Sequence, residues 1–145
     1  MKAKVLFVGD APDDGADVLG KPFVGNGGEL LDNLIEGAGH LAGYQPKCFL
    51  TYLLACKARN FKFTKEQMEA CAPRINDLVE RIQPRAIIMV GKEAHKWAPK
   101  VIDYDFQYSA DIDHPNIMHY VDLSQRDYVI QRSVVRIADI FELVM

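Results

Sequence analysis

Cysteine is scarce in this sequence, and the few cysteines present form no recognisable pattern. Cys48, Cys56 and Cys71 are odd in number and include no CxxC pair. Such a set indicates buried thiols in a reducing compartment rather than a disulfide framework. A metal centre would need a further ligand from the four histidines, none of which stands at a recognisable ligand spacing. We therefore expect no metal and no cofactor.

Long apolar runs and a strong charge bias are also missing. No stretch approaches the roughly 20 residues that a membrane-spanning helix requires, and residues 1–4 lead into a short apolar segment rather than a signal peptide. The net charge of -3 argues against a general nucleic-acid coat protein, yet it leaves room for a small basic patch. We expect a cytoplasmic monomer without a membrane segment.

What is present is the composition of a globular domain. Hydrophobic residues make up 49% and charged residues 26% of the 145 residues, close to the globular average. A chain of this length is expected to form one domain, residues 1–145, that buries roughly 70% of the surface its unfolded form exposes.

Apolar segments alternate along the chain with segments of helical periodicity. Buried strands are predicted near residues 4–8, 47–55, 85–91 and, more weakly, 106–112. Helices are predicted near residues 29–38, 65–82, 92–97 and 124–143. Gly37 and Gly39 are expected to stop the first helix, and Thr64 and Gln67 match a capping box before the second. This order predicts an α/β fold of three layers, in which helices cover both faces of a central four-stranded parallel sheet.

The first predicted strand delivers a carboxylate to the edge of the sheet. Asp10 follows the apolar run 5–9 directly, and ligands of open parallel sheets bind in the crevice beyond the carboxyl ends of the strands. Taken alone, Asp10 is equally well explained as a residue that caps the turn after this strand. The other polar or special residues expected at this edge are Thr51, Tyr52, Gly91, Lys92 and His114.

A basic segment without any acid follows the second predicted strand. Residues 57–65 hold four basic residues interleaved with one asparagine and two phenylalanines. Such a segment is suited to contacting phosphates, although a solvated loop anchored by its phenylalanines explains the composition equally well. Its basic and amide residues are Lys57, Arg59, Asn60, Lys62 and Lys65.

Several short motifs stand out in a fixed order. Residues 9–12 read Gly-Asp-Ala-Pro, residues 20–25 read Gly-Lys-Pro-Phe-Val-Gly and residues 114–116 read His-Pro-Asn. Together they resemble the uracil-DNA glycosylase superfamily, where the corresponding motifs read Gly-Glu-Ala-Pro, Gly-Arg-Pro-Phe-Val-Gly and His-Pro-Ser. The resemblance covers most of the chain and is greatest to the bacterial and archaeal members that usually carry an iron–sulfur cluster.

This resemblance implies a DNA glycosylase that hydrolyses the N-glycosidic bond of a flipped uracil or related modified pyrimidine. It implies that Asp10 positions or activates the attacking water, that Phe23 stacks on the base and that His114 hydrogen-bonds the leaving base. Without the resemblance, Phe23 is better explained as a core residue and His114 as a surface residue. The base-binding residues would be Gly9, Ala11, Phe23 and Tyr52. The DNA-binding residues would be Lys57, Arg59, Asn60, Lys62, Lys92, Pro115 and Asn116.

Besides Asp10 for glutamate and Asn116 for serine, the sequence departs from this family at two further places. The cluster requires four cysteines, of which only Cys71 matches a ligand position, so we expect no cluster. Thr51-Tyr52 stands where the family carries Thr-Asn, and a tyrosine cannot reproduce the paired donor and acceptor of an amide. A second interpretation therefore stays open: a glycosylase fold that binds DNA or a partner protein without excising a base. A weaker third is metal-dependent phosphoester chemistry at the aspartates after the first strand.

Overall fold

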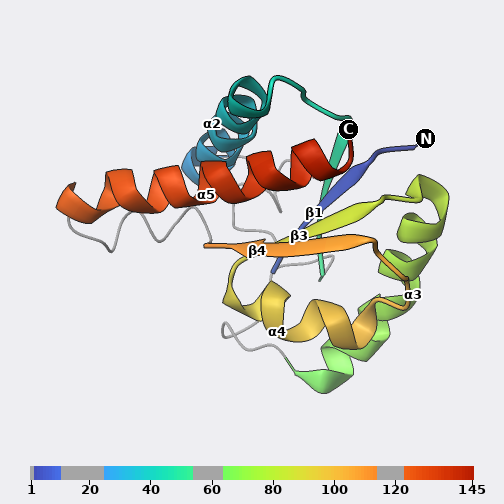
Figure 1. Ribbon diagram of the computed structural model, residues 1–145. Helices are drawn as coiled ribbons and strands as arrows, with labels where there is room; N and C mark the ends of the chain where they lie inside the picture. Colours follow the sequence, from blue (N-terminus) through green and yellow to red (C-terminus); the bar gives the residue numbers. More distant parts are fainter. Residues whose placement is uncertain (1, 11–24, 54–63, 114–122) are drawn as a thin grey trace.

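The computed structural model describes residues 2–10, 25–53, 64–113 and 123–145. Strands and helices alternate along these residues, which confirms the predicted α/β fold (Figure 1). The strands are β1 (Val5–Gly9), β2 (Cys48–Tyr52), β3 (Ala86–Val90) and β4 (Tyr108–Ile112). The helices are α2 (Gly25–Ala42), α3 (Lys65–Ile82), α4 (Lys92–Val101) and α5 (Leu123–Leu143).

The four strands form one parallel sheet in the order β2-β1-β3-β4. Val5 of β1 is paired with Cys48 of β2 on one side and with Ala86 of β3 on the other. β1 and β3 are buried along their whole length, whereas β2 and β4 at the edges are partly exposed. Central strands covered on both faces need continuous apolar sequences, and these two strands have them.

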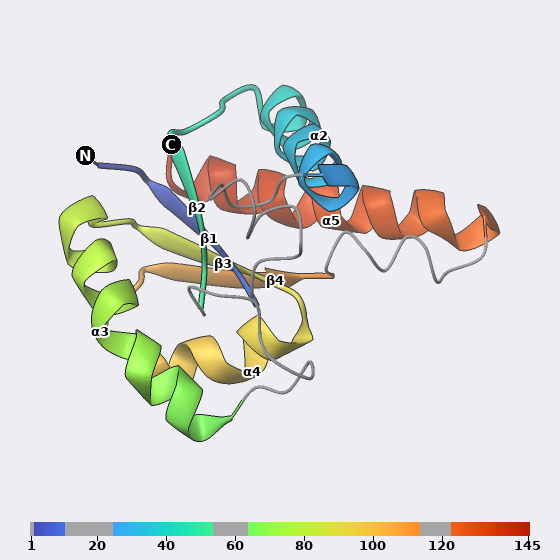
Figure 2. The same ribbon diagram turned by 180° about the vertical axis from the view of Figure 1, so that it is seen from behind.

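Helices cover both faces of the sheet, as the two opposite views show (Figures 1 and 2). Side chains alternate along β1: Val5 and Phe7 belong to the apolar cluster of α2 and α5, whereas Leu6 and Val8 belong to that of α3 and α4. All four are fully buried, and each such side chain contributes about 1.5–3 kcal/mol through its removal from water. The two layers hold the carboxyl ends of the strands at one edge.

The predicted start of α3 is confirmed and the predicted end of α2 is wrong. The Thr64 side chain accepts a hydrogen bond from the backbone N–H of Gln67, whose own side chain accepts from the Thr64 N–H. α2 continues through Gly37 and Gly39, because Gly37 lies against Val134 of α5 and the contact between the two helices outweighs the low helix propensity of glycine. The helix ends before Gly43, where φ is +72°.

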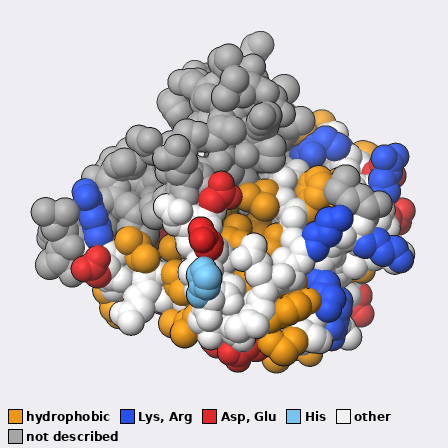
Figure 3. Space-filling model, turned by 90° about the horizontal axis from the view of Figure 1, so that it is seen from above, with side chains coloured by type: hydrophobic (Ala, Val, Ile, Leu, Met, Phe, Trp, Pro, Cys, Tyr) orange, Lys and Arg blue, Asp and Glu red, His pale blue; other side chains and the backbone are white. Residues whose placement is uncertain are grey.

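The outer surface of the α2 and α5 layer is mixed in character. Figure 3 looks onto this side of the molecule, where acidic side chains lie near the middle and Lys and Arg side chains gather along one side. Four large apolar side chains are also exposed on the described parts of these helices, namely Leu41, Tyr128, Val135 and Leu143. No helix in the described part of the chain is both long and apolar enough to cross a bilayer.

Candidate active site

Asp10 lies at the carboxyl end of β1, against the first turn of α4. Its Oδ1 atom accepts a hydrogen bond of 2.6 Å from the backbone N–H of Ala94, the third residue of α4. That N–H would otherwise be one of the unpaired donors at a helix start. Gly91, at the N-cap position, has no side chain to provide such a bond. Asp10 therefore caps α4 from the end of a strand in the sheet; the turn that follows Asp10 lies outside the described residues.

The environment of Asp10 favours its protonated form. The pKa of this carboxyl is raised from 3.8 to about 6: burial raises it most, the hydrogen bond from Ala94 opposes the rise, and the nearby charge of Glu93 adds to it. In a largely buried position the ionised form of a carboxyl group loses the water that stabilises its charge, so the neutral form is favoured. A pKa near neutrality suits a group that takes up a proton during a reaction.

The end of β2 lies beside the end of β1. Gly9 is in register with Tyr52, and the N–H of Leu53 donates to the Gly9 carbonyl at 2.9 Å. The Tyr52 side chain is only 8% exposed and packs in the apolar cluster beneath α2 and α5. Thr51 is buried on the opposite face of the sheet. The residue that stands in place of the family's asparagine thus contributes to the core.

Arg74 of α3 holds this strand end in place. Its guanidinium donates to the Thr51 hydroxyl and to the Leu53 carbonyl, both at 3.4 Å, and to the Tyr52 carbonyl. These acceptors lie at the carboxyl end of β2, on its last two paired residues and on the residue that follows them. The sequence analysis missed this residue, because an arginine next to the apolar positions of an amphipathic helix looks like any solvated side chain.

The end of β4 is tied to both helical layers. Arg132 of α5 pairs with Asp113, which raises the pKa of the arginine. Arg136 donates to the Asp111 carbonyl at 2.8 Å, and His95 of α4 lies 3.7 Å from the Asp111 carboxylate. These contacts, also missed from the sequence, fix the residue that directly precedes the predicted catalytic histidine.

The structure brings part of the predicted site together. Gly9, Asp10, Tyr52 and Lys92 lie on strand or helix ends at the same edge of the sheet, with Lys92 exposed as the first residue of α4. The other predicted residues lie outside the described part of the chain and stay predictions. They are Ala11, Phe23, Lys57, Arg59, Asn60, Lys62, His114, Pro115 and Asn116.

The cysteines described do not fit an iron–sulfur cluster. Cys48 packs against the layer of α2 and α5, and Cys71 packs against the layer of α3 and α4, so the sheet separates them. Burial also raises the pKa of the Cys48 thiol to about 12, which disfavours the thiolate that a cluster needs. Cys56 lies outside the described residues. Among the residues that are described, no three His, Cys, Asp or Glu side chains form a group that could hold a metal ion.

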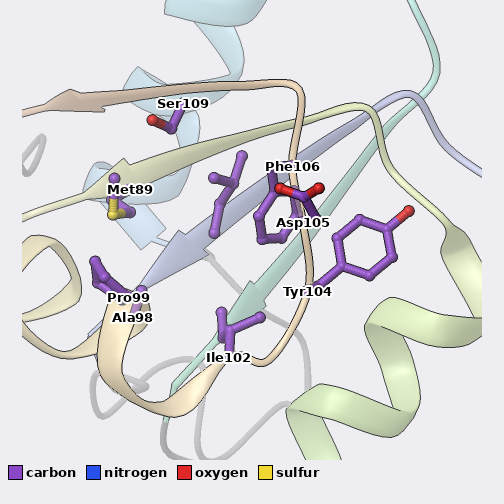
Figure 4. A pocket seen from close by; sticks show the side chains of 9 residues that line it. Met89, Ala98, Pro99, Ile102, Tyr104, Asp105, Phe106 and Ser109 are labelled. Carbon is purple, nitrogen blue, oxygen red and sulfur yellow. The ribbon is translucent and has the colours of Figure 1, made fainter.

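A cavity of about 290 Å³ lies elsewhere, between α4 and the half of the sheet formed by β3 and β4 (Figure 4). Its walls are chiefly apolar, and the rings of Tyr104 and Phe106 meet edge to face at 4.8 Å. Asp105 and Ser109 supply its polar groups. The cavity shares no lining residue with the surroundings of Asp10, so we place the candidate active site at the strand ends.

Comparison with known proteins shows the family to which the chain belongs. The family model of the uracil DNA glycosylase superfamily matches residues 1–135. The type-4 uracil-DNA glycosylase of Saccharolobus solfataricus is 36% identical over 94 residues, which are 64% of this chain and 43% of that protein. The type-4 enzyme of Archaeoglobus fulgidus is 31% identical over 106 residues, 72% of this chain and 52% of that protein. The chain thus spans about half the length of these relatives.

A solved structure extends the likeness to the fold. The crystal structure of SMUG2 from Pedobacter heparinus aligns with a TM-score of 0.64 at 14% sequence identity, covering 93% of this chain and 74% of that one. At this identity the likeness concerns the fold alone. The family model, by contrast, matches the sequence over nearly its whole length. The chain therefore belongs to the uracil DNA glycosylase superfamily.

Proposed function

We propose that this protein is a DNA glycosylase, which hydrolyses the N-glycosidic bond of a flipped uracil or related modified pyrimidine. The observation that carries the proposal is Asp10, a largely buried carboxylate with a pKa of about 6 at the end of a central strand. Its position matches the first motif of the family, and the relatives named above are uracil-DNA glycosylases. A carboxylate kept in a costly environment is typical of a functional group.

The proposed mechanism uses the two oxygens of Asp10 differently. Oδ1 is occupied by the Ala94 N–H, whereas Oδ2 has no hydrogen-bond partner among the described residues. Oδ2 would therefore accept a proton from a water molecule as the water oxygen bonds to C1′ of the sugar. The bond from C1′ to the base breaks, and the base leaves with the bonding electrons. General-base assistance of this kind contributes about 10²- to 10⁴-fold in rate.

Two further roles are proposals from the family motifs. Phe23 would stack on the flipped base, and His114 would donate a hydrogen bond to the negative charge that develops on it. The contacts of Arg132 with Asp113 support the second role, because they anchor the residue just before His114. We propose no amide contact from Tyr52, whose ring lies in the core, so other groups must select the base.

The substrate is proposed to be DNA, contacted by Lys92 and by the basic residues between 57 and 65. Exposure of Lys92 at the same edge as Asp10 supports this.

We also keep the proposal that the protein acts as a cytoplasmic monomer. Cys48 and Cys71 are free thiols, as expected in a reducing compartment, which supports the location.

The test uses oligonucleotides, single- and double-stranded, that contain uracil, hydroxymethyluracil or hypoxanthine. After incubation, alkali cleaves every abasic site, so strand breaks report excision. We expect product from at least one pyrimidine with the wild-type protein and none with Asp10→Asn. Absence of product on every base, with enzyme equal to substrate, would contradict the proposal. Activity that persists in EDTA would exclude metal-dependent phosphoester chemistry.

One observation favours a second function. The buried Tyr52 replaces the side chain with which the family reads uracil, and this would suit a module that binds DNA or a partner without excision. In that case binding would be unaffected by Asp10→Asn and His114→Ala, and no base would be released. The excision assay and a binding assay on the same oligonucleotides separate the two functions.

A further inference from the structure

We propose that Gly91 is a positioning residue, which acts through Asp10: the absence of a side chain at Gly91 lets the first turn of α4 hold the carboxylate in one orientation. This inference rests on the proposed function, in which Asp10 assists the attack of water. Gly91 itself would touch neither water nor DNA. Its role would be to keep space for the two oxygens of the carboxylate.

The backbone of Gly91 is in a conformation that only glycine adopts readily. Its φ is +104° and its ψ is 166°, outside the regions open to residues with a Cβ atom. The residue is buried, and its N–H donates to the Ile112 carbonyl of β4 at 3.0 Å. This bond to the neighbouring strand holds Gly91 in place, so the segment cannot swing away to accept a side chain.

The carboxylate of Asp10 fills the space where a side chain would begin. A Cβ atom at Gly91 would lie 3.1 Å from both Oδ1 and Oδ2 of Asp10, and 3.4 Å from its Cγ. The contact involves the whole carboxylate rather than the tip of a flexible chain. Because Gly91 is bonded to β4, the carboxylate would have to give way.

A displaced carboxylate would lose its orientation before the protein lost its fold. The Ala94 N–H holds Oδ1 at 2.6 Å and so directs Oδ2 to the side where water would be. A contact of 3.1 Å would require the carboxylate to shift by a few tenths of an ångström, and since misplacement by about 1 Å can lower a rate by about 10²-fold, we expect a smaller loss. DNA binding would be unchanged, because neither Gly91 nor Asp10 is required to contact the backbone. The expected signature is a loss in kcat without a rise in KM.

Gly43 provides a matched control. It is also a glycine at positive φ, +72°, but nothing lies within 4 Å of the Cβ atom it would carry. Gly43→Ala therefore adds backbone strain without a contact to Asp10. If Gly91 mattered only as a flexible residue, Gly43→Ala and Gly91→Ala would behave alike. Under our proposal, Gly43→Ala keeps the wild-type kcat.

The experiment compares wild type, Gly91→Ala and Gly43→Ala in two measurements. The first is excision kinetics on the base that the wild type removes, where we expect kcat to fall by about 10-fold, and by less than about 10²-fold, in Gly91→Ala alone. The second is the NMR shift of the Ala94 amide against pH, which should follow Asp10 in wild type and Gly43→Ala but not in Gly91→Ala. An unchanged kcat and amide titration in Gly91→Ala would overturn the proposal.

The two measurements also separate this inference from the proposed function. A wild type that excises no base would contradict the glycosylase function, while the amide titration would still decide whether Gly91 positions the carboxylate. If Gly91→Ala does not fold, the double variant Asp10→Gly with Gly91→Ala decides the matter. Recovery of folding supports a clash with Asp10, whereas continued failure to fold points to the backbone alone and overturns the proposal.

Discussion

The Ala94 N–H donates to Oδ1 of Asp10 at 2.6 Å, so the first turn of α4 is capped by a residue 84 positions earlier in the chain. A capping contact of this type is ordinarily a stabilising feature of a helix. Here, however, the capping group is a carboxylate in a largely buried place, and burial outweighs the hydrogen bond in setting its pKa. Asp10 therefore stabilises α4 through its hydrogen bond and destabilises the fold through its buried charge. Experiments can separate these two effects.

The first prediction is that Asp10→Asn stabilises the protein at neutral pH. The pKa of Asp10 is about 6 in the folded protein against 3.8 ordinarily, so the folded state binds more protons between these values. Stability from this group is full below pH 4 and is lost as the pH rises through 6. The free energy of unfolding that is lost over this pH range is at most about 3 kcal/mol. An asparagine keeps an oxygen for Ala94 without the charge.

Urea denaturation at several pH values measures this difference. We expect Asp10→Asn to be more stable than wild type at pH 7–8 and to lose this advantage as the pH falls toward 4. The variant should at the same time be inactive in the excision assay. A variant less stable than wild type at pH 7 would show that the hydrogen bond, rather than burial of the charge, dominates at this site.

The second prediction concerns the pH dependence of activity. A general base must be ionised, so kcat/KM should rise with pH through about 6, the pKa of Asp10. The charge of Glu93 contributes to this high pKa. Glu93→Gln should therefore move the rise in activity to lower pH. Glu142→Gln on α5, which covers the opposite face of the sheet, should leave the profile unchanged. A profile of Glu93→Gln that matches wild type would exclude this coupling.

The third prediction is that Arg74 stabilises the end of β2. Arg74→Ala removes the donor to Thr51 and to the carbonyls of Tyr52 and Leu53. Loss of a charged donor that leaves buried acceptors unpaired costs about 1–3 kcal/mol, which thermal or urea denaturation can measure. The control is Arg81→Ala on the same helix, whose pair with Asp77 is largely exposed. Exposed pairs contribute about 0–1 kcal/mol. Equal effects of the two substitutions would contradict the role of Arg74.

The fold was predictable because its signals are local and repeated. Continuous apolar runs marked β1 and β3, and the Thr64 capping box marked the start of α3. The contacts of the site were not predictable in the same way. The bond between Asp10 and Ala94 and those of Arg74 join residues far apart in sequence, and only the arrangement of the helices on the sheet determines them. Motif order predicted Asp10 as a site residue, but not the helix that holds it.

The end of α2 is a case in which a local sequence signal led to a wrong prediction. Gly37 and Gly39 predicted a stop, because glycine is unfavourable in a helix by about 1 kcal/mol. The helix runs to Ala42, since Ala38 and Ala42, which follow Gly37, still pack in the apolar cluster shared with α5. Packing between two helices exceeds a local preference of this size. A signal that depends on one residue type is thus weaker than one that depends on a periodic face.

The fourth prediction addresses the base pocket through Tyr52. Tyr52→Asn would restore the residue that the family carries, but it would also remove a ring that is 8% exposed in the cluster of α2 and α5. Replacing a large buried aromatic side chain costs about 3–5 kcal/mol. We therefore expect a marked fall in stability and no gain in uracil excision. Ala110→Ser, a polar substitution of a partly buried residue beside the same cluster, provides a milder control.

The opposite result would carry a specific meaning. If Tyr52→Asn were as stable as wild type and excised uracil faster, the ring would have to lie in the base pocket rather than in the core. Denaturation and excision measured on the same preparation therefore decide between the two places. Tyr52 is in register with Gly9, the residue before Asp10, so the substitution lies next to the proposed site and a pocket role would show in the excision rate.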